Sequence, residues 1–246
     1  MKSVSNHRTI RKYSSRDIEP DLLHRLLAEA SRTQTMGNLQ LYSVIVTRSR
    51  EGKAALAPAH FNQPMVMNAP VVLTICADFR RTTAWAHFRQ ASPGYDNFLS
   101  FVNAATDALL FTQTFSILAE DEGLGLCYLG TTLYQPQAII KTLSLPQLVF
   151  PVATLTLGWP TEEPSLSDRL PVDGFVHDEV YHDPVREDID RIYAAKEALE
   201  VNREFVRQNN KETLAQVFTD IRYTRKDNEA MSQTLLEALQ QQGFLQ

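Results

Sequence analysis

Two apolar stretches with many β-branched residues constrain the fold more than any other feature of this sequence. They are APVVLTICAD (69–78) and FPVATLTLGWP (150–160), and each is nearly continuous in apolar or β-branched side chains. Such runs are typical of strands that are buried on both faces. YSVIVTRS (42–49) is a third strand candidate. The sequence therefore predicts a sheet that has little contact with solvent.

The run between the two main strand candidates, residues 96–123, is long enough for about seven helical turns. Its apolar side chains cover much more than one stripe of a helix. They are Phe98, Phe101, Val102, Ala105, Leu109, Phe111, Phe115 and Leu118. A helix that is apolar nearly all round is buried on several sides. We expect it either at the centre of a large domain or between two subunits.

Further helices are expected at residues 18–33, 186–206 and 228–244 from their apolar spacing. Helices alternate with strands, so the fold class is α/β or α+β. Residues 158–184 are rich in proline and acidic side chains, and we expect an extended surface arm there.

The charge balance excludes some classes of function. The chain has 246 residues, with 24 basic and 29 acidic side chains and a net charge of −5, which argues against general binding of nucleic acid or of a membrane surface. No stretch is long and apolar enough to span a membrane, and residues 1–13 lack the apolar part of a signal peptide. We expect a cytoplasmic protein in which Cys76 and Cys127 are small buried residues.

The usual catalytic motifs are absent. There is no G-x-S-x-G, H-E-x-x-H, P-loop or C-x-x-C, and no set of side chains with metal-ligand spacing. His177 and His182 are better explained as surface residues than as a metal pair. GLGLCYLG (123–130) lacks the dinucleotide-loop spacing, so we expect Gly123 to end the long helix before a short strand. The backbone beside Gly130 could still approach a planar ligand closely.

HRTIRKYS (7–14) is a cationic segment in an acidic chain. Arg8 and Arg11 are spaced to face one way in a helical turn, and arginine pairs favour phosphate. Two surface arginines without a ligand would give the same pattern. From the residues alone, both interpretations stay open.

Six motifs in order resemble the nitroreductase and flavin reductase family, specifically its larger NADPH-preferring, oxygen-insensitive nitroreductase branch. They are the HRTIRKYS segment with the helix after it, TQTMGNLQLYSVIV, NQPMVMNAPVVLTICAD, GLGLCYLGTT, LSLPQLVFPVATLTLGWP and RLPVDGFVHDEVY. The resemblance covers most of residues 7–183 and weakens after them. It implies an α+β fold with a central, mostly antiparallel sheet flanked by helices, a long central helix and a helical C-terminal extension. It also implies an FMN-binding part at 1–183, with the extension at 184–246 packed on the same domain.

The resemblance also implies the site. FMN would be held by one set of residues, which comprises His7, Arg8, Thr9, Arg11, Thr35, Met36, Gln63, Tyr128, Leu129, Gly130, Thr131, Ser167 and Arg169. The first four would bind the phosphate, 128–131 would lie along the isoalloxazine ring, and Arg169 would close on the phosphate from the arm. Ser167 stands where the branch has a lysine, and Asp168 follows it, so we expect weaker neutralisation of the phosphate. NADPH would be bound by Lys211, Arg222 and Arg225.

The implied activity is that of an FMN-dependent NADPH oxidoreductase working as a homodimer. It would reduce nitroaromatics, quinones or free flavin by ping-pong hydride transfer through flavin N5, without a catalytic side chain and without a metal. Two alternatives require the same flavin site. One is an FMN-binding protein that does not turn over nicotinamide, in flavin handling or regulation. The other is an FMN enzyme of the same fold with oxidative or dehalogenating chemistry.

Overall fold

The computed structural model describes residues 2–245, which form two compact units. The first unit contains the residues up to Ser165 together with those from Met231 onward, and the second is Leu166–Ala230. The predicted division into a flavin-binding part and a helical extension is a functional one, and it stays a prediction.

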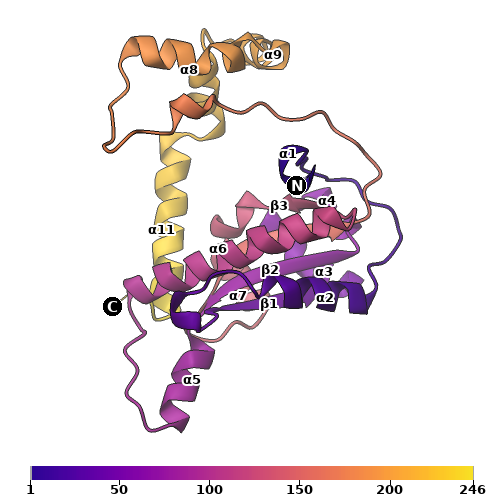
Figure 1. The fold of residues 1–246 in the computed structure, drawn as a ribbon, viewed down its shortest axis with the longest axis vertical. Coiled ribbons are helices and arrows are strands. Elements are labelled where there is room, and N and C mark those ends of the chain that lie inside the picture. Colours follow the sequence, from indigo (N-terminus) through magenta and orange to yellow (C-terminus); the bar gives the residue numbers. More distant parts are fainter. Residues whose placement is uncertain (1, 246) are drawn as a thin grey trace. The chain divides into compact units, whose positions relative to one another are not determined.

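The first unit is built on one antiparallel sheet with the strand order β1-β2-β4-β3 (Figure 1). The strands are β1 (Tyr42–Thr47), β2 (Val71–Asp78), β3 (Gly125–Tyr128) and β4 (Val149–Gly158). The three predicted strands and the short strand after the long helix are therefore confirmed. The pairing of β2 with β4 shifts between Ile75 and Cys76, opposite Pro151, and a proline cannot donate to a ladder.

Helices cover both faces of this sheet (Figure 1). In the first unit they are α1 (Lys2–Ser5), α2 (Pro20–Ala30), α3 (Arg50–Leu56), α4 (Pro64–Asn68), α5 (Arg80–Phe88), α6 (Phe98–Asp121) and α7 (Pro136–Thr142), with the 3-10 turns η1 (Met36–Asn38), η2 (Ala57–His60) and η3 (Gly130–Leu133). The helices α2 and α6 pack on one face, and α3, α4 and α7 pack on the other. Every residue of β2 and β4 is buried, and the predicted α+β class is confirmed.

The main core also contains residues from the end of the chain. Phe101 of α6 packs against Phe150 of β4 and against Phe244, with ring centroids 5.3 and 5.5 Å apart. The side-chain amide of Gln242 donates to the carbonyl oxygens of Pro146 and Val149, at 2.8 and 2.6 Å. The core of the first unit is therefore completed by residues from 231 onward.

The long helix α6 begins and ends as expected. The side chain of Asn97 accepts a hydrogen bond from the backbone N–H of Ser100 at its start, and Gly123 follows its end with a φ of +82°. One side of α6 is buried in the core, but Leu99 is 68% exposed and Leu109 is 47% exposed. A subunit interface on this outer side stays a prediction.

The second unit holds the arm and most of the C-terminal helices, and the bounds of these helices differ from the predicted ones. Its elements are η4 (Val172–Gly174), α8 (Arg186–Ala198), α9 (Glu200–Gln208), α10 (Leu214–Val217) and the π-helical turn η5 (Phe218–Arg222), followed by α11 (Arg225–Gln241), which begins here and ends in the first unit. The predicted continuous helix over 186–206 is wrong, because Leu199 is extended. There the side chain of Asn202 donates to the carbonyl oxygen of Lys196. The helical turns over 214–222 were not predicted.

Candidate functional site

Three segments of the first unit meet beside β3. The first is the cationic segment, whose Ile10 N–H donates to the carbonyl oxygen of Leu126 in β3 at 2.9 Å. A Cβ on Gly125 would lie 2.7 Å from the side chain of Ile10, so only glycine allows this approach. The second segment is η3, which follows β3, and the third is the turn at 57–63, where His60 contacts the Thr131 side chain of η3.

The cationic segment is not a helical turn, so the spacing argument for Arg8 and Arg11 does not hold. Nδ1 of His7 lies 2.5 Å from Oε1 of Glu120, and burial raises the pKa of this carboxyl group while the contact with His7 opposes the rise. Nε of Arg8 donates to the carbonyl oxygen of Pro164 at 2.7 Å. Thr9, the next residue, is half-buried. His7 and Arg8 are therefore already engaged by acceptors of this chain.

Arg11 is in a different situation. Its guanidinium lies beside the Cys127 thiol. Burial raises the pKa of this thiol, and Arg11 offsets part of the rise. Among residues 2–245, no carboxylate forms an ion pair with it. Its backbone N–H and that of Lys12 donate to Oε1 of Glu162, at 2.8 and 3.1 Å, and the first of these bonds is the main reason why the pKa of Glu162 is lowered. Arg11 is thus exposed and available to an anion.

A cavity of about 450 Å³ borders the same segment. Its charged lining comprises Arg8, Glu120, Asp121, Glu162 and Glu163. Four carboxylates against one arginine give this cavity the wrong sign for a phosphate. A phosphate on this segment would have to lie on the side where Arg11 is.

The turn at 57–63 carries two buried polar atoms that have no hydrogen-bond partner. They are Oε1 of Gln63 and Nε2 of His60. Nδ1 of His60 lies 2.8 Å from Oγ1 of Thr131, and burial lowers the pKa of this histidine to about 4. His60 is therefore neutral at pH 7. Because buried polar atoms are nearly always paired, the free oxygen of Gln63 marks a place for a donor.

Residues 128–131 form the end of β3 and the start of η3. The hydroxyl of Tyr128 lies 3.4 Å from Oγ of Ser116 on α6, and the N–H of Leu129 donates to the carbonyl oxygen of Thr154 at 2.9 Å. A Cβ added to Gly130 would meet no atom within 4 Å. The backbone here is therefore fixed in position and open on one side.

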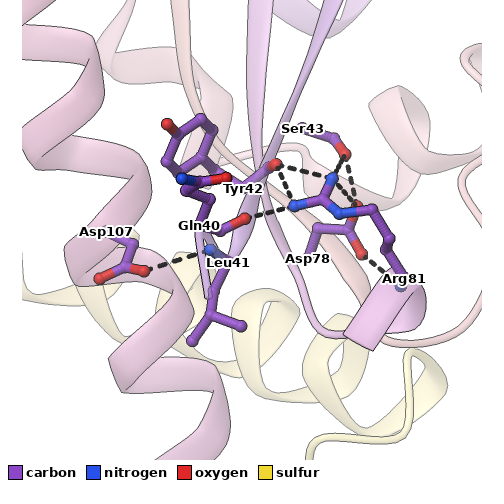
Figure 2. A network of polar contacts seen from close by, with 7 residues as sticks. All are labelled: Gln40, Leu41, Tyr42, Ser43, Asp78, Arg81 and Asp107. Carbon is purple, nitrogen blue, oxygen red and sulfur yellow. Dashed lines mark hydrogen bonds and ion pairs between the residues drawn. The ribbon is translucent and has the colours of Figure 1, made fainter. Parts of the chain in front are cut away.

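The loop that carries Thr35 and Met36 is held from two directions (Figure 2). Asp107 of α6 is only 1% exposed, and its two carboxylate oxygens accept from the N–H groups of Met36 and Leu41, at 2.8 and 3.2 Å. From the other side, the guanidinium of Arg81 donates to the carbonyl oxygens of Gln40 and Tyr42. Three residues of this loop have left-handed backbones; they are Gly37, Asn38 and Gln40, with φ of +57°, +56° and +52°.

The predicted arm residues Ser167 and Arg169 lie in the second unit and are exposed. Nη1 of Arg169 donates to the carbonyl oxygen of Asp168 at 2.8 Å. Nζ of Lys196 lies 2.8 Å from Oδ2 of Asp168, and this hydrogen bond lowers the pKa of the carboxyl group. The acid that departs from the family pattern is thus neutralised within its own unit.

The three predicted NADPH residues also lie in the second unit, in different surroundings. Nζ of Lys211 pairs with Asp220 at 2.9 Å, and Nε of Arg225 pairs with Glu229 at 2.8 Å. Arg222 instead lies over the ring of Phe205, with its guanidinium carbon 4.6 Å from the ring centroid. No carboxylate among residues 2–245 forms an ion pair with Arg222.

Four side chains at these places were not predicted from the sequence: His60, Arg81, Asp107 and Lys196. Only Asp107 left a signal, since it is the one carboxylate between Phe98 and Leu118 in an otherwise apolar run. The described residues contain no group of three side chains that could hold a metal. None of their helices is long and apolar enough to cross a membrane.

Comparisons with known proteins agree with the fold. A model of the nitroreductase family matches residues 4–159. An FMN reductase [NAD(P)H] of Bacillus subtilis is 31% identical over 183 residues, 74% of each chain. An oxygen-insensitive NADPH nitroreductase of Salmonella typhimurium is 30% identical over 178 residues, 72% of each chain. A crystal structure of a Bacteroides fragilis protein superposes over 100% of both chains with a TM-score of 0.98 and 59% identity.

Proposed function

This chain belongs to the nitroreductase family and is an NAD(P)H-dependent flavin oxidoreductase, and we propose that it binds FMN and prefers NADPH. Its electron acceptors would be nitroaromatics, quinones or free flavin. The relatives named FMN reductase and NADPH nitroreductase support both cofactors.

The observation that carries this proposal is the meeting of three segments around unsatisfied groups. Arg11 offers a cation without a carboxylate partner, Gln63 offers a buried oxygen without a donor, and Gly130 leaves the backbone open. A phosphate, a ring N–H and a flat ring face are the complements of these three groups. The residues present therefore fit FMN.

Bound FMN would supply two-electron chemistry, which explains why no nucleophile is needed. The work of this chain is binding and orientation. Arg11 would neutralise the phosphate, with Arg169 of the arm as a second cation. The carbonyl and N–H groups of 128–131 would face the ring, and Oε1 of Gln63 would accept a hydrogen bond from a ring N–H.

Arg222 is the best candidate for the 2′-phosphate of NADPH. The aromatic ring of Phe205 orients its guanidinium, and no carboxylate competes for it. Lys211 and Arg225 would have to break ion pairs with Asp220 and Glu229 before they could serve. We therefore expect Arg222 to contribute most to the preference for NADPH.

We also propose a homodimer. Leu99, Val102, Leu109 and Leu110 leave the outer side of α6 apolar and more than 40% exposed. Contiguous exposed apolar side chains are typical of interaction surfaces. A second copy of the chain would bury them.

The proposal is tested by purifying the protein and mixing it with NADPH in a stopped-flow spectrophotometer. We expect yellow protein, near twice 27.9 kDa by sedimentation, whose flavin absorbance bleaches within one turnover and returns when a nitroaromatic or quinone is added. A colourless protein that does not take up FMN would refute the cofactor. A yellow protein that NADPH does not bleach would favour flavin handling or oxidative chemistry instead.

A further inference from the structure

The turn that follows η2 has an unusual backbone. Phe61 and Asn62 both have left-handed conformations, each with φ of +53°. Asparagine adopts this region routinely, but for a bulky side chain such as that of Phe61 it is a genuine outlier. Such a residue is retained only where the surroundings impose its conformation.

Hydrogen bonds within the turn impose this conformation. The N–H of Phe61 donates to the carbonyl oxygen of Pro58 at 3.1 Å, and that of Asn62 donates to Ala57 at 2.8 Å. The N–H of Gln63 donates to the carbonyl oxygen of His60 at 3.1 Å. The turn is therefore closed on both sides of the left-handed pair.

The strain separates neighbouring side chains. His60 is fully buried and bonded to Thr131, whereas the ring of Phe61 is 53% exposed. Exposure of a phenyl ring to water is unfavourable, and so is the left-handed backbone conformation of Phe61. Packing within the first unit gives no reason for Phe61 at this position.

The position of the turn offers a reason. The contact of His60 with Thr131 fixes the turn beside η3, and the surface over Gly130 is open. In the proposed function, the flavin ring lies along 128–131. Phe61 would then stand at the edge of the place where an electron acceptor must approach.

We propose that Phe61 forms an aromatic wall of the acceptor site and selects planar aromatic acceptors, nitroaromatics and quinones, by stacking. Aromatic rings favour offset or edge-to-face contacts with one another. The backbone strain at this residue is tolerated because it presents the ring. This inference rests on the proposed function, since it needs a reducible flavin beside η3.

The test compares Phe61→Gly with Asn62→Gly. Both changes place glycine at a left-handed residue, so both should keep the fold. Only Phe61→Gly removes a ring. With saturating NADPH, we expect Phe61→Gly to raise KM about tenfold for a nitroaromatic and for a quinone, the size of one aromatic contact. Asn62→Gly should match the parent, and Phe61→Tyr should restore it.

Ferricyanide, a non-aromatic acceptor, separates recognition from general damage. We expect its KM and kcat to stay within twofold of the parent in Phe61→Gly. An equal loss with ferricyanide, or a change in oligomeric state, would show that Phe61 shapes the turn or an interface. An unchanged KM for aromatic acceptors would also overturn the inference. A parent protein that NADPH does not bleach would refute the proposed function, and this inference with it.

Discussion

Replacing Asp107 by asparagine tests how the loop at 35–41 is held. The carboxylate accepts one hydrogen bond on each oxygen, from the N–H groups of Met36 and Leu41. Asparagine has nearly the same shape but can accept on one oxygen only. Its amide nitrogen would face an N–H donor, and the side chain is only 1% exposed, so water cannot replace the lost acceptor.

The expected cost follows from the lost contact. A hydrogen bond to a charged group contributes about 1.5–3 kcal/mol, and a buried donor left without a partner costs a similar amount. We expect Asp107→Asn to lower the free energy of unfolding of the apoprotein by about 2 kcal/mol. If Thr35 and Met36 contact FMN, the loosened loop should also weaken FMN binding about tenfold or more.

The assay is urea unfolding of the apoprotein, together with titration of FMN followed by quenching of its fluorescence. Asp121→Asn is the matched control, because Asp121 is an exposed carboxylate on the same helix and should change either quantity little. Parent-like stability in Asp107→Asn would refute the reasoning. Lower stability with unchanged FMN affinity would show that the loop is not part of the flavin site.

Three further predictions concern single ionisable side chains. Arg11→Ala should weaken FMN binding by about 1.5–3 kcal/mol, measured by the same titration, whereas Lys12→Ala should have little effect; equal losses would mean that only general charge matters. Arg222→Gln should lower kcat/KM for NADPH by a factor that corresponds to a similar free energy, and it should leave kcat/KM for NADH nearly unchanged. Arg225→Gln is the control, and equal losses with both reductants would place the 2′-phosphate elsewhere. The pKa of His60 is lowered to about 4 from an unfolded value near 6.5, so between these pH values the unfolded state binds more protons than the folded state. The free energy of unfolding should therefore be unaffected by His60 above pH 6.5 and should be about 2 kcal/mol lower at pH 5. Urea unfolding at both pH values should show this loss, and a His60→Gln variant that loses the same stability on acidification would contradict it.

The sheet and the main helix could be predicted because their signals are strong. Continuous apolar strands and a long apolar helix leave few other arrangements, and Gly123 and Asn97 mark the ends of α6. The break at Leu199 could not be predicted, since the apolar pattern continues through it, and the hydrogen bond from the Asn202 amide to the carbonyl oxygen of Lys196 joins residues on its two sides. The π-helical turn at 218–222, which the N–H of Tyr223 closes by donating to the carbonyl oxygen of Phe218 at 2.8 Å, has no buried residue and therefore left no apolar pattern in the sequence.

The site residues were predicted from the resemblance, and the structure shows what surrounds each of them. The sequence presents Arg8 and Arg11 as equivalent, but the structure pairs Arg8 with backbone carbonyls and leaves Arg11 without a carboxylate partner. Which cation is available depends on residues far away in the chain, such as Pro164. For the same reason, the neutralisation of Asp168 by Lys196 could not be foreseen.

Completion of the first unit's core by Phe244 and Gln242 has a consequence for how this protein is made. Synthesis proceeds from the N-terminus, so α6 and β4 leave the ribosome well before the residues that cover Phe101 and Phe150. Until then, the nascent sheet exposes apolar surface, which is when chains aggregate or need chaperones. A chain that stops at residue 230 would stay in that state permanently, even though it contains every residue proposed to bind a cofactor.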